Sequence, residues 1–335
     1  MIPFNLVSPG GIGDIIISIP ILKKIYELCG EFHEFSLWSQ YPEVAKIYLP
    51  EFKDHKQINK TGTFNVQEHG GCWLSVIDTP IFKFANKEVT LHRSMEKMFK
   101  TWMNAREDWG ILIDKFPFSV HQIAHKSVAI DMHRVDLPRY LLGLKCNDYI
   151  PPTSVNNHGN FITVHDGFDV SMDLRRGYST KNWPLRNWED FVSNFKAKHP
   201  DLKVYQLGTE KSRPIPGADH SLLGNTNWMG TTYWLEHSLC HVDGESGLVH
   251  ARRLYKKPSV VMFGPTLMEY YAYPENENIP SDVCHPCFWI SPQWQNECFL
   301  SKSPEDWEPA CMKAIRPETV FQRVNKIIDA TPQFA

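Results

Sequence analysis

The segment Gly10-Gly11-Ile12-Gly13-Asp14 holds the first residues whose types and spacing could do chemistry. It lies between a short apolar run and a longer apolar-periodic one, which is the pattern of a strand, a turn and a helix. Glycines at such a turn, here Gly11 and Gly13, let backbone amides approach a ligand, and the helix N-terminus adds partial positive charge. The alternative is a tight turn in which Asp14 only caps the helix.

A second segment, Ser179-Thr180-Lys181-Asn182-Trp183-Pro184, combines hydroxyl groups with a lysine. It follows a predicted strand, and ligands of open α/β sheets bind outside the carboxyl ends of the strands. Lys181 is therefore placed to meet phosphate oxygens, with Thr180 beside it. The simpler alternative is a solvated lysine next to a packing tryptophan.

A third segment runs from Asp243 to His250, with the sequence Asp-Gly-Glu-Ser-Gly-Leu-Val-His. It follows a short strand and starts a helix, so the amides of Ser246 and Gly247 could bind an anion. Glu245 could accept hydrogen bonds from ribose or sugar hydroxyls. The alternative is a variant of the capping box with His250 packed in the helix.

Four of the eight cysteines fall close together near the C-terminus: Cys284, Cys287, Cys298 and Cys311. The Cys-x2-Cys pair places two thiolates on one knuckle, and two more can close a tetrahedral site for zinc or iron. Four thiolate ligands leave no open position, so such a metal would be structural, and we expect no catalytic metal. The alternative is four reduced cysteines in a loop-rich segment. We expect the other four to pack in the core: Cys29, Cys72, Cys146 and Cys240.

Two strand-turn-helix units position these residues, and each is typical of the beginning of a doubly wound domain. The first has a strand at 4–7 and a helix at 14–28, and the second has a strand at 161–164 and a helix at 188–198. Between them, a linker rich in Pro, Asn and Gly indicates domains 1–152 and 153–335.

Alternation continues in the second domain, with strands expected at 204–208, 240–243 and 258–264 and a helix at 232–239. The sequence therefore predicts an α/β protein of two Rossmann-like domains, the second with a parallel sheet.

Composition excludes several classes of protein. The 335 residues are 42% hydrophobic with a formal net charge of −3, so nonspecific nucleic-acid or membrane-surface binding has no compositional support. The longest apolar stretch, 15–22, is interrupted by Ser18 and Pro20 and is shorter than the roughly 20 residues that a membrane span needs. The N-terminus has no signal-peptide pattern, so we expect a cytoplasmic protein.

The ordered motifs resemble those of family 9 glycosyltransferases, typified by the ADP-heptose:lipopolysaccharide heptosyltransferases. The order is Gly-Gly-x-Gly-Asp, then Lys-x-Trp-Pro, then acidic-Ser-Gly-x-x-His, then Phe-Gly-Pro-Thr at 263–266. Cys311-Met312-Lys313-Ala314-Ile315-Arg316-Pro317-Glu318-Thr319-Val320 also fits a stretch of related family members. The resemblance covers the first strand, turn and helix and most of the second half; the region from about Glu31 to Asp148 does not match.

The resemblance implies the GT-B fold, in which two Rossmann-like domains face each other across a cleft. It also implies that Asp14 is the general base toward an acceptor hydroxyl and that Lys181 neutralises the diphosphate leaving group. The donor site would be completed by Gly11, Gly13, Thr180, Glu245, Ser246, Gly247, Leu248 and His250. The family usually has Asp where this chain has Glu245, so the identity of the donor sugar does not follow from the resemblance.

The predicted activity is therefore an inverting transfer of a sugar, hexosyl or heptosyl, from an ADP- or other nucleotide-diphosphate sugar to a hydroxyl. The acceptor, on a glycan, a protein or another molecule, is not specified. Two alternatives stay open, a noncatalytic nucleotide-sugar-binding protein and a glycosyltransferase acting on a nucleic-acid base.

Overall fold

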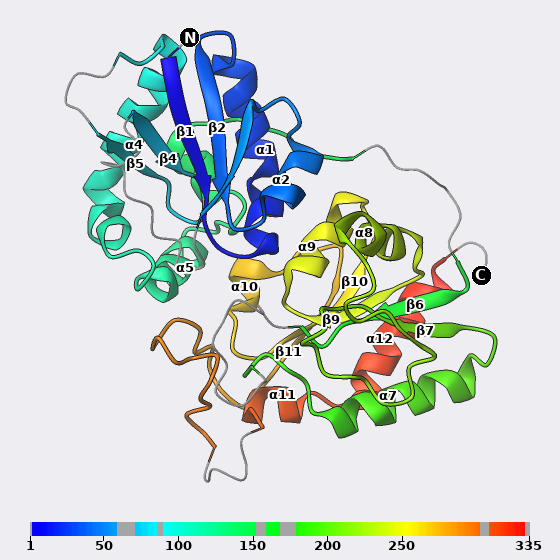
Figure 1. Ribbon diagram of the computed structural model, residues 1–335. Helices are drawn as coiled ribbons and strands as arrows, with labels where there is room; N and C mark the ends of the chain where they lie inside the picture. The colour runs from blue at the N-terminus through cyan, green and yellow to red at the C-terminus, as the bar shows by residue number, and fades with distance from the viewer. Residues whose placement is uncertain are drawn as a thin grey trace. The chain divides into compact units, whose positions relative to one another are not determined.

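The chain folds into two compact units, Met1–Tyr149 and Ile150–Ala335 (Figure 1). The structure is a computed structural model and describes residues 2–58, 71–85, 90–151, 159–167, 179–301 and 308–331. Each unit contains a sheet with helices packed against it, and each is considered by itself.

The sheet of the N-terminal unit has the strand order β3-β2-β1-β4-β5. The first four strands run parallel, and β5 pairs antiparallel to β4 at one edge. The central strand β1 is paired on both sides, and its apolar residues Phe4, Leu6 and Val7 are buried. The strands are β1 (Ile2–Ser8), β2 (His33–Ser39), β3 (Asp54–Gln57), β4 (Cys72–Ser75) and β5 (Ile81–Phe84).

Helix α1 follows β1 directly, connects it to β2 and is largely apolar. Its residues from Ile15 to Leu22 are all buried, including Pro20 inside the helix. A helix that is apolar on nearly all sides has to be covered on nearly all sides, and α1 contacts β1, α2 and α4. The helices of this unit are α1 (Ile12–Cys29), α2 (Pro42–Tyr48), α4 (Arg93–Asp114), α5 (Val120–Val128) and α6 (Leu137–Leu142).

The sheet of the C-terminal unit has the order β11-β10-β9-β6-β7-β8, and all its pairings are parallel. Every residue of the central strands β6, β9 and β10 is buried, as expected for a parallel sheet covered on both faces. The strands are β6 (Phe161–Val164), β7 (Lys203–Gln206), β8 (His220–Ser221), β9 (His241–Gly244), β10 (Ser259–Phe263) and β11 (Glu277–Pro280).

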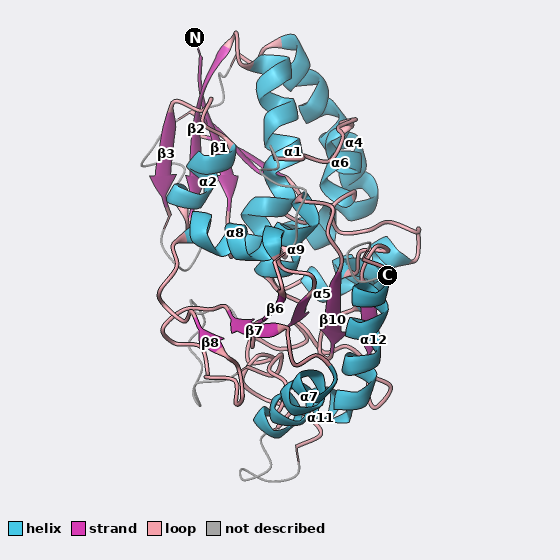
Figure 2. Ribbon diagram, turned by 90° about the vertical axis from the view of Figure 1, so that its right-hand side faces the viewer, coloured by secondary structure: helices cyan, strands magenta, loops and turns pink. Residues whose placement is uncertain are grey.

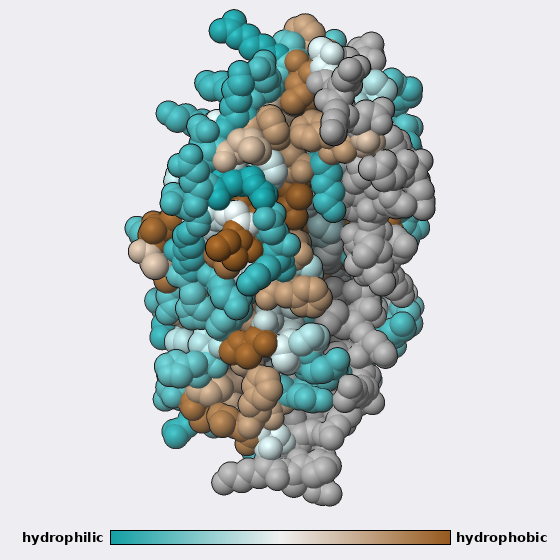
Figure 3. Space-filling model, turned by 90° about the vertical axis from the view of Figure 1, so that its left-hand side faces the viewer, coloured by the Kyte–Doolittle hydropathy of each residue, from teal (hydrophilic) through white to brown (hydrophobic). Residues whose placement is uncertain are grey.

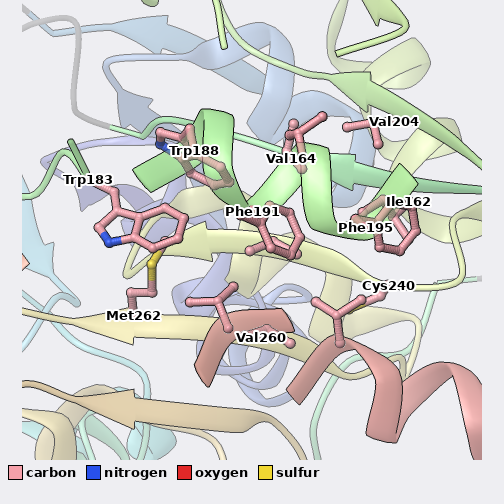
Figure 4. Close-up of a cluster of buried hydrophobic side chains, with 14 of the residues drawn as sticks. Ile162, Val164, Trp183, Trp188, Phe191, Phe195, Val204, Cys240, Val260 and Met262 are labelled. Atoms are coloured by element: carbon pink, nitrogen blue, oxygen red, sulfur yellow. The ribbon is translucent and has the colours of Figure 1, made fainter. Parts of the chain in front are cut away.

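Helices cover both faces of this second sheet (Figure 2). Helices α8 and α9 contact each other on one face, and α7 and α12 contact each other on the opposite face. The core on the α7 side includes Trp183, Trp188 and Phe191, which lie against strand residues such as Val164 (Figure 4). The helices are α7 (Leu185–Lys198), α8 (Trp228–His237), α9 (Gly247–Leu254), α10 (Met268–Tyr271), α11 (Ala310–Ala314) and α12 (Pro317–Asp329).

A fully buried arginine, Arg252 in α9, ties the end of α8 to the sheet. Its guanidinium donates to the backbone carbonyls of Leu235, Ser238, Leu239 and Pro258. The last carbonyls of a helix have no partner inside the helix, and a planar group with five N–H donors can satisfy several at once. Burial lowers the pKa of Arg252 to about 10, so the side chain stays charged at neutral pH.

The predicted secondary structure agrees with this architecture, with shifts at the ends of elements. The helix expected at 232–239 begins earlier, at Trp228, because Asn227 caps it by accepting from the Gly230 amide. The parallel second sheet is confirmed, whereas the antiparallel strand β5 was not predicted. Residues 152–158 of the expected linker lie outside the described residues.

The spread cysteines follow the core prediction with one exception. Cys29, Cys72 and Cys240 are buried, but Cys146 is half-buried, so the prediction is wrong for Cys146. It lies beyond the end of α6, in a segment without regular structure.

Hydrophobic side chains also reach the surface at several separate places among hydrophilic ones, as Figure 3 shows for one face. Within the described ranges, no helix is both long and apolar enough to cross a bilayer.

Candidate functional site

Asp14 lies in the first turn of α1, and its side chain approaches the preceding turn so closely that residue 10 has to be a glycine. Gly10 has a φ of +101°, and a Cβ at that residue would lie 2.2 Å from the Oδ2 atom of Asp14. The Gly11 amide donates to the same Oδ2 over 2.8 Å. This contact is one half of a capping box, so the capping role considered for Asp14 is present. Gly13 lies in the first turn of α1.

Two residues that the sequence analysis did not single out complete the surroundings of Asp14. The Arg134 Nη2 atom lies 2.5 Å from Asp14 Oδ1, and its Nε atom donates to Asp78 Oδ1 over 2.8 Å. Asp78 follows β4, the neighbour of β1 in the sheet. Because these two strands are neighbours, the carboxylates of Asp14 and Asp78 lie close together. Arg134 lies in the segment that precedes α6.

The electrostatic environment of Asp14 combines opposing effects. Burial raises the pKa of its carboxyl group, the Arg134 guanidinium lowers that pKa, and the nearby Asp78 raises it, leaving it above the ordinary value. The side chain nevertheless keeps 20% of its surface exposed, so a ligand can reach the carboxylate.

In the C-terminal unit, Lys181, Glu245 and His250 form one cluster. The Lys181 ammonium lies 2.6 Å from Glu245 Oε2, and His250 Nε2 lies 3.5 Å from Glu245 Oε1. His250 is held from its other side by the hydroxyl of Tyr273, 2.7 Å from Nδ1. Burial alone would raise the pKa of Glu245, but Lys181 and His250 hold it well below its ordinary value.

The predicted residues Ser246, Gly247 and Leu248 lie at the start of α9. Ser246 is the N-cap, and its Oγ atom accepts from the Leu248 amide; Gly247 is the first helical residue. Thr180 differs from the prediction in its surroundings, because its hydroxyl donates to the Trp294 carbonyl and its amide donates to the Gln295 carbonyl. Thr180 is thus buried in the loop, while Lys181 extends to Glu245.

A buried network lies beside this cluster at the carboxyl ends of β6 and β9. Asp243 Oδ2 lies 2.8 Å from His165 Nδ1 and 3.3 Å from His241 Nε2, and it also accepts from the Ser246 hydroxyl. Burial lowers the pKa of His241 below its ordinary value. For His165, burial also acts downward on the pKa, but Asp243 outweighs burial and the pKa is raised above its ordinary value.

The structure therefore brings together the predicted residues of each unit, with Asp14, Gly11 and Gly13 in one and Lys181, Glu245, Ser246, Gly247, Leu248 and His250 in the other. Sequence reasoning missed Asp78, Arg134 and His165. Asp78 and His165 follow strands that neighbour the strands carrying the motifs, a signal that needs the strand order. Arg134 has no sequence signal that we can identify.

The four clustered cysteines influence one another electrostatically. Burial, together with the neighbouring thiols, raises the pKa of Cys287 to about 11, and the pKa of Cys311 is raised by burial and by Cys284, Cys287 and Cys298. Across the described part of the chain, no group of three or more His, Cys, Asp or Glu side chains is arranged to hold a metal ion. Thiolate sulfur is a donor that suits zinc or iron.

The chain resembles known proteins in its sequence and in its fold. No protein-family profile matches the sequence. The chain is 21% identical over 343 residues to lipooligosaccharide heptosyltransferase 2 of Campylobacter jejuni, covering 96% of each protein.

Among solved structures, the iron-containing dodecameric glycosyltransferase TibC of enterotoxigenic E. coli matches with a TM-score of 0.57 at 11% identity, over 99% of this chain and 80% of that one. E. coli heptosyltransferase WaaC, solved with ADP, matches with a TM-score of 0.53 at 12% identity, over 97% of this chain and 99% of that one. The predicted resemblance and the GT-B fold class are confirmed.

The Asp243 network yields a prediction for stability. The pKa of Asp243 is lowered from 3.8 to about 2, so its ion pairing stabilises the fold above pH 3.8, and this contribution is lost as the pH falls toward 2. The raised pKa of His165 means that the imidazolium contribution is complete below 6.5 and is lost as the pH rises through the folded pKa. We expect Asp243→Asn to lower the free energy of unfolding by about 2 kcal/mol near pH 5.5.

Urea denaturation over a range of pH would measure this effect. The difference between Asp243→Asn and the unmodified protein should shrink as the pH approaches 2, whereas Asp282→Asn, at an exposed carboxylate, should change stability little at any pH. A difference that stays constant from pH 5.5 to 2 would contradict the assignment of this ion pair.

Proposed function

We propose that this family 9 heptosyltransferase-like chain is an inverting glycosyltransferase that uses a nucleotide-diphosphate sugar. The observation that carries the proposal is the presence, in a chain with a GT-B fold, of Asp14 at a glycine turn in one unit and of a Lys181–Glu245–His250 cluster at the start of α9 in the other. The relatives support the donor class, because TibC was solved with ADP-D-beta-D-heptose and WaaC with ADP.

In this proposal the C-terminal domain, 153–335, holds the donor. Lys181 contacts the diphosphate, and the N-terminus of α9 offers the amide of Gly247, whose partial positive charge favours an anion. Lys181 is paired with Glu245 over 2.6 Å, so an arriving diphosphate has to share or replace that contact. Glu245 would then be available to sugar or ribose hydroxyls, which donate hydrogen bonds to a carboxylate.

The N-terminal domain, 1–152, holds the acceptor and supplies the base. In a single displacement, the acceptor hydroxyl gives its proton to Asp14 as its oxygen forms the new bond to the anomeric carbon. The bond from that carbon to the diphosphate oxygen breaks at the same time, and Lys181 balances the charge on the leaving group. One carboxylate on the acceptor side and one cation on the leaving-group side are sufficient for this step, and it needs no covalent intermediate.

Asp14→Asn tests the proposed base. An amide cannot accept the proton, so we expect transfer to fall by at least about 100-fold, while the dissociation constant for the nucleoside diphosphate stays within about twofold. Turnover with a panel of nucleotide sugars and calorimetric titration with nucleoside diphosphates would measure the two effects. Near-normal turnover would refute the base, and donor binding without any turnover in the unmodified protein would favour a noncatalytic binding protein.

Lys181→Met tests the donor contact. The methionine keeps an unbranched side chain of similar length but removes its charge, so nucleoside-diphosphate affinity should fall by about tenfold or more, because a charge-assisted hydrogen bond contributes roughly 1.5–3 kcal/mol. Lys211→Met, at an exposed lysine of the same unit, is the matched control and should bind normally. Unchanged affinity of the Lys181 variant in a calorimetric titration would count against the proposed role.

We further propose that Cys284, Cys287, Cys298 and Cys311 bind a structural zinc or iron ion. The support is the set of four mutually interacting thiols and the iron content of TibC. The raised pKa values of Cys284 and Cys287 mean that metal binding would have to displace protons and would be favoured by higher pH.

Elemental analysis of the purified protein should find about one zinc or iron per chain, and Cys287→Ser should lose it and lower the melting temperature. Cys146→Ser, which removes a half-buried thiol outside the cluster, should retain the metal. Metal-free protein with an unaltered melting temperature would contradict the proposal.

A further inference from the structure

We propose that Arg134 is a positioning residue for Asp14 and that the buried Asp78 anchors Arg134 for this role. The inference rests on the proposed function, in which Asp14 is the base. It concerns two residues that no motif of the sequence includes. Along the chain, Asp78 lies 56 positions from Arg134, and Arg134 lies 120 positions from Asp14.

Asp78 holds the guanidinium of Arg134 through both of its carboxylate oxygens. Arg134 Nε donates to Asp78 Oδ1 over 2.8 Å, and Nη2 donates to Asp78 Oδ2 over 3.2 Å. Such paired contacts fix the plane of a guanidinium as well as its position. The side chain of Asp78 is only 4% exposed, and its backbone has a φ of +47°, in a region that non-glycine residues seldom adopt. The anchor is therefore set by the tertiary structure and not by local preference.

Arg134 then presents Nη2 to the proposed base. That atom lies 2.5 Å from Asp14 Oδ1, while the Gly11 amide donates to Oδ2. Both carboxylate oxygens are thereby held, and each keeps a further lone pair. The Asp14 carboxylate is fixed in orientation, yet it can still accept a proton from a hydroxyl that approaches its exposed side.

Arg134 also affects the ionisation of Asp14. The charged groups that act on Asp14 are Arg134, which favours its ionised form, and Asp78, which disfavours it. Without the guanidinium, two carboxylates would share a partly dehydrated site, and one of them would take up a proton. Arg134 itself keeps its protons and forms no bond to the substrates during transfer.

The opposite signs of these two influences provide a sharp test. In Arg134→Met, the acid limb of the pH profile of kcat/KM should move to higher pH by at least about one unit, and turnover at pH 7 should fall by about 10- to 100-fold. In Asp78→Asn, the repelling charge is removed, so the acid limb should move to lower pH while the anchor is weakened. Arg134→Lys keeps the charge without the paired contacts, so it should lose turnover with little movement of the limb.

A matched control is Arg139→Met. Arg139 lies in α6 of the same unit and pairs with Asp136 and Asp148 instead of Asp14. It should leave the acid limb in place. Added guanidinium ion should restore part of the activity of Arg134→Met and none to Asp14→Asn, which a merely destabilised variant would not show.

A readout independent of turnover separates this inference from the proposed function. The carboxyl 13C resonance of Asp14, assigned by its loss in Asp14→Asn, should titrate at higher pH in Arg134→Met than in the unmodified protein and at lower pH in Asp78→Asn. An unchanged Asp14 titration in a folded Arg134→Met variant would overturn the inference. If these shifts occur but no nucleotide sugar supports transfer, the positioning contact stands and the proposed function fails.

Discussion

A charged side chain that leaves bulk water needs an opposite charge, and this requirement organises both units of the protein. In the N-terminal unit Arg134 lies between Asp14 and Asp78, and in the C-terminal unit Lys181 pairs with Glu245. Removing one partner from a buried pair leaves an uncompensated charge, which costs far more than the pair gains. Each of these groups is therefore held firmly by its partner in the same unit.

This arrangement has a consequence for how an anionic ligand would bind. A diphosphate that reaches Lys181 exchanges one anion for another, so the ammonium stays neutralised, and Glu245 keeps its contact with His250. The rest of the cluster is prepared for that exchange, because His250 is fixed by Tyr273 and Ser246 is fixed as the cap of α9. Preorganised groups of this kind lower the free-energy cost of ordering side chains on binding.

The two units differ in how much of their architecture is visible in residue patterns. In the C-terminal unit, fully buried apolar strands follow one another, and runs such as 161–164 and 259–263 predict a parallel sheet without ambiguity. The N-terminal unit has only half-buried strands at its edges; β3 is largely solvent-facing and β5 pairs antiparallel. Such strands have weak periodicity, and their place in the sheet depends on partners that are remote in sequence.

By itself, the sequence determined the strand-turn-helix openings, the glycine turn in front of Asp14, and the helix start at Ser246, because these depend on backbone conformation and on neighbours a few residues away. It did not determine the partners of the candidate residues. The pairing of Glu245 with Lys181 spans 64 positions, and that of Arg134 with Asp14 spans 120. Only the tertiary structure decided these contacts, since the order of strands within each sheet fixes which loops meet at its carboxyl edge, and burial there forces the charges that meet to pair.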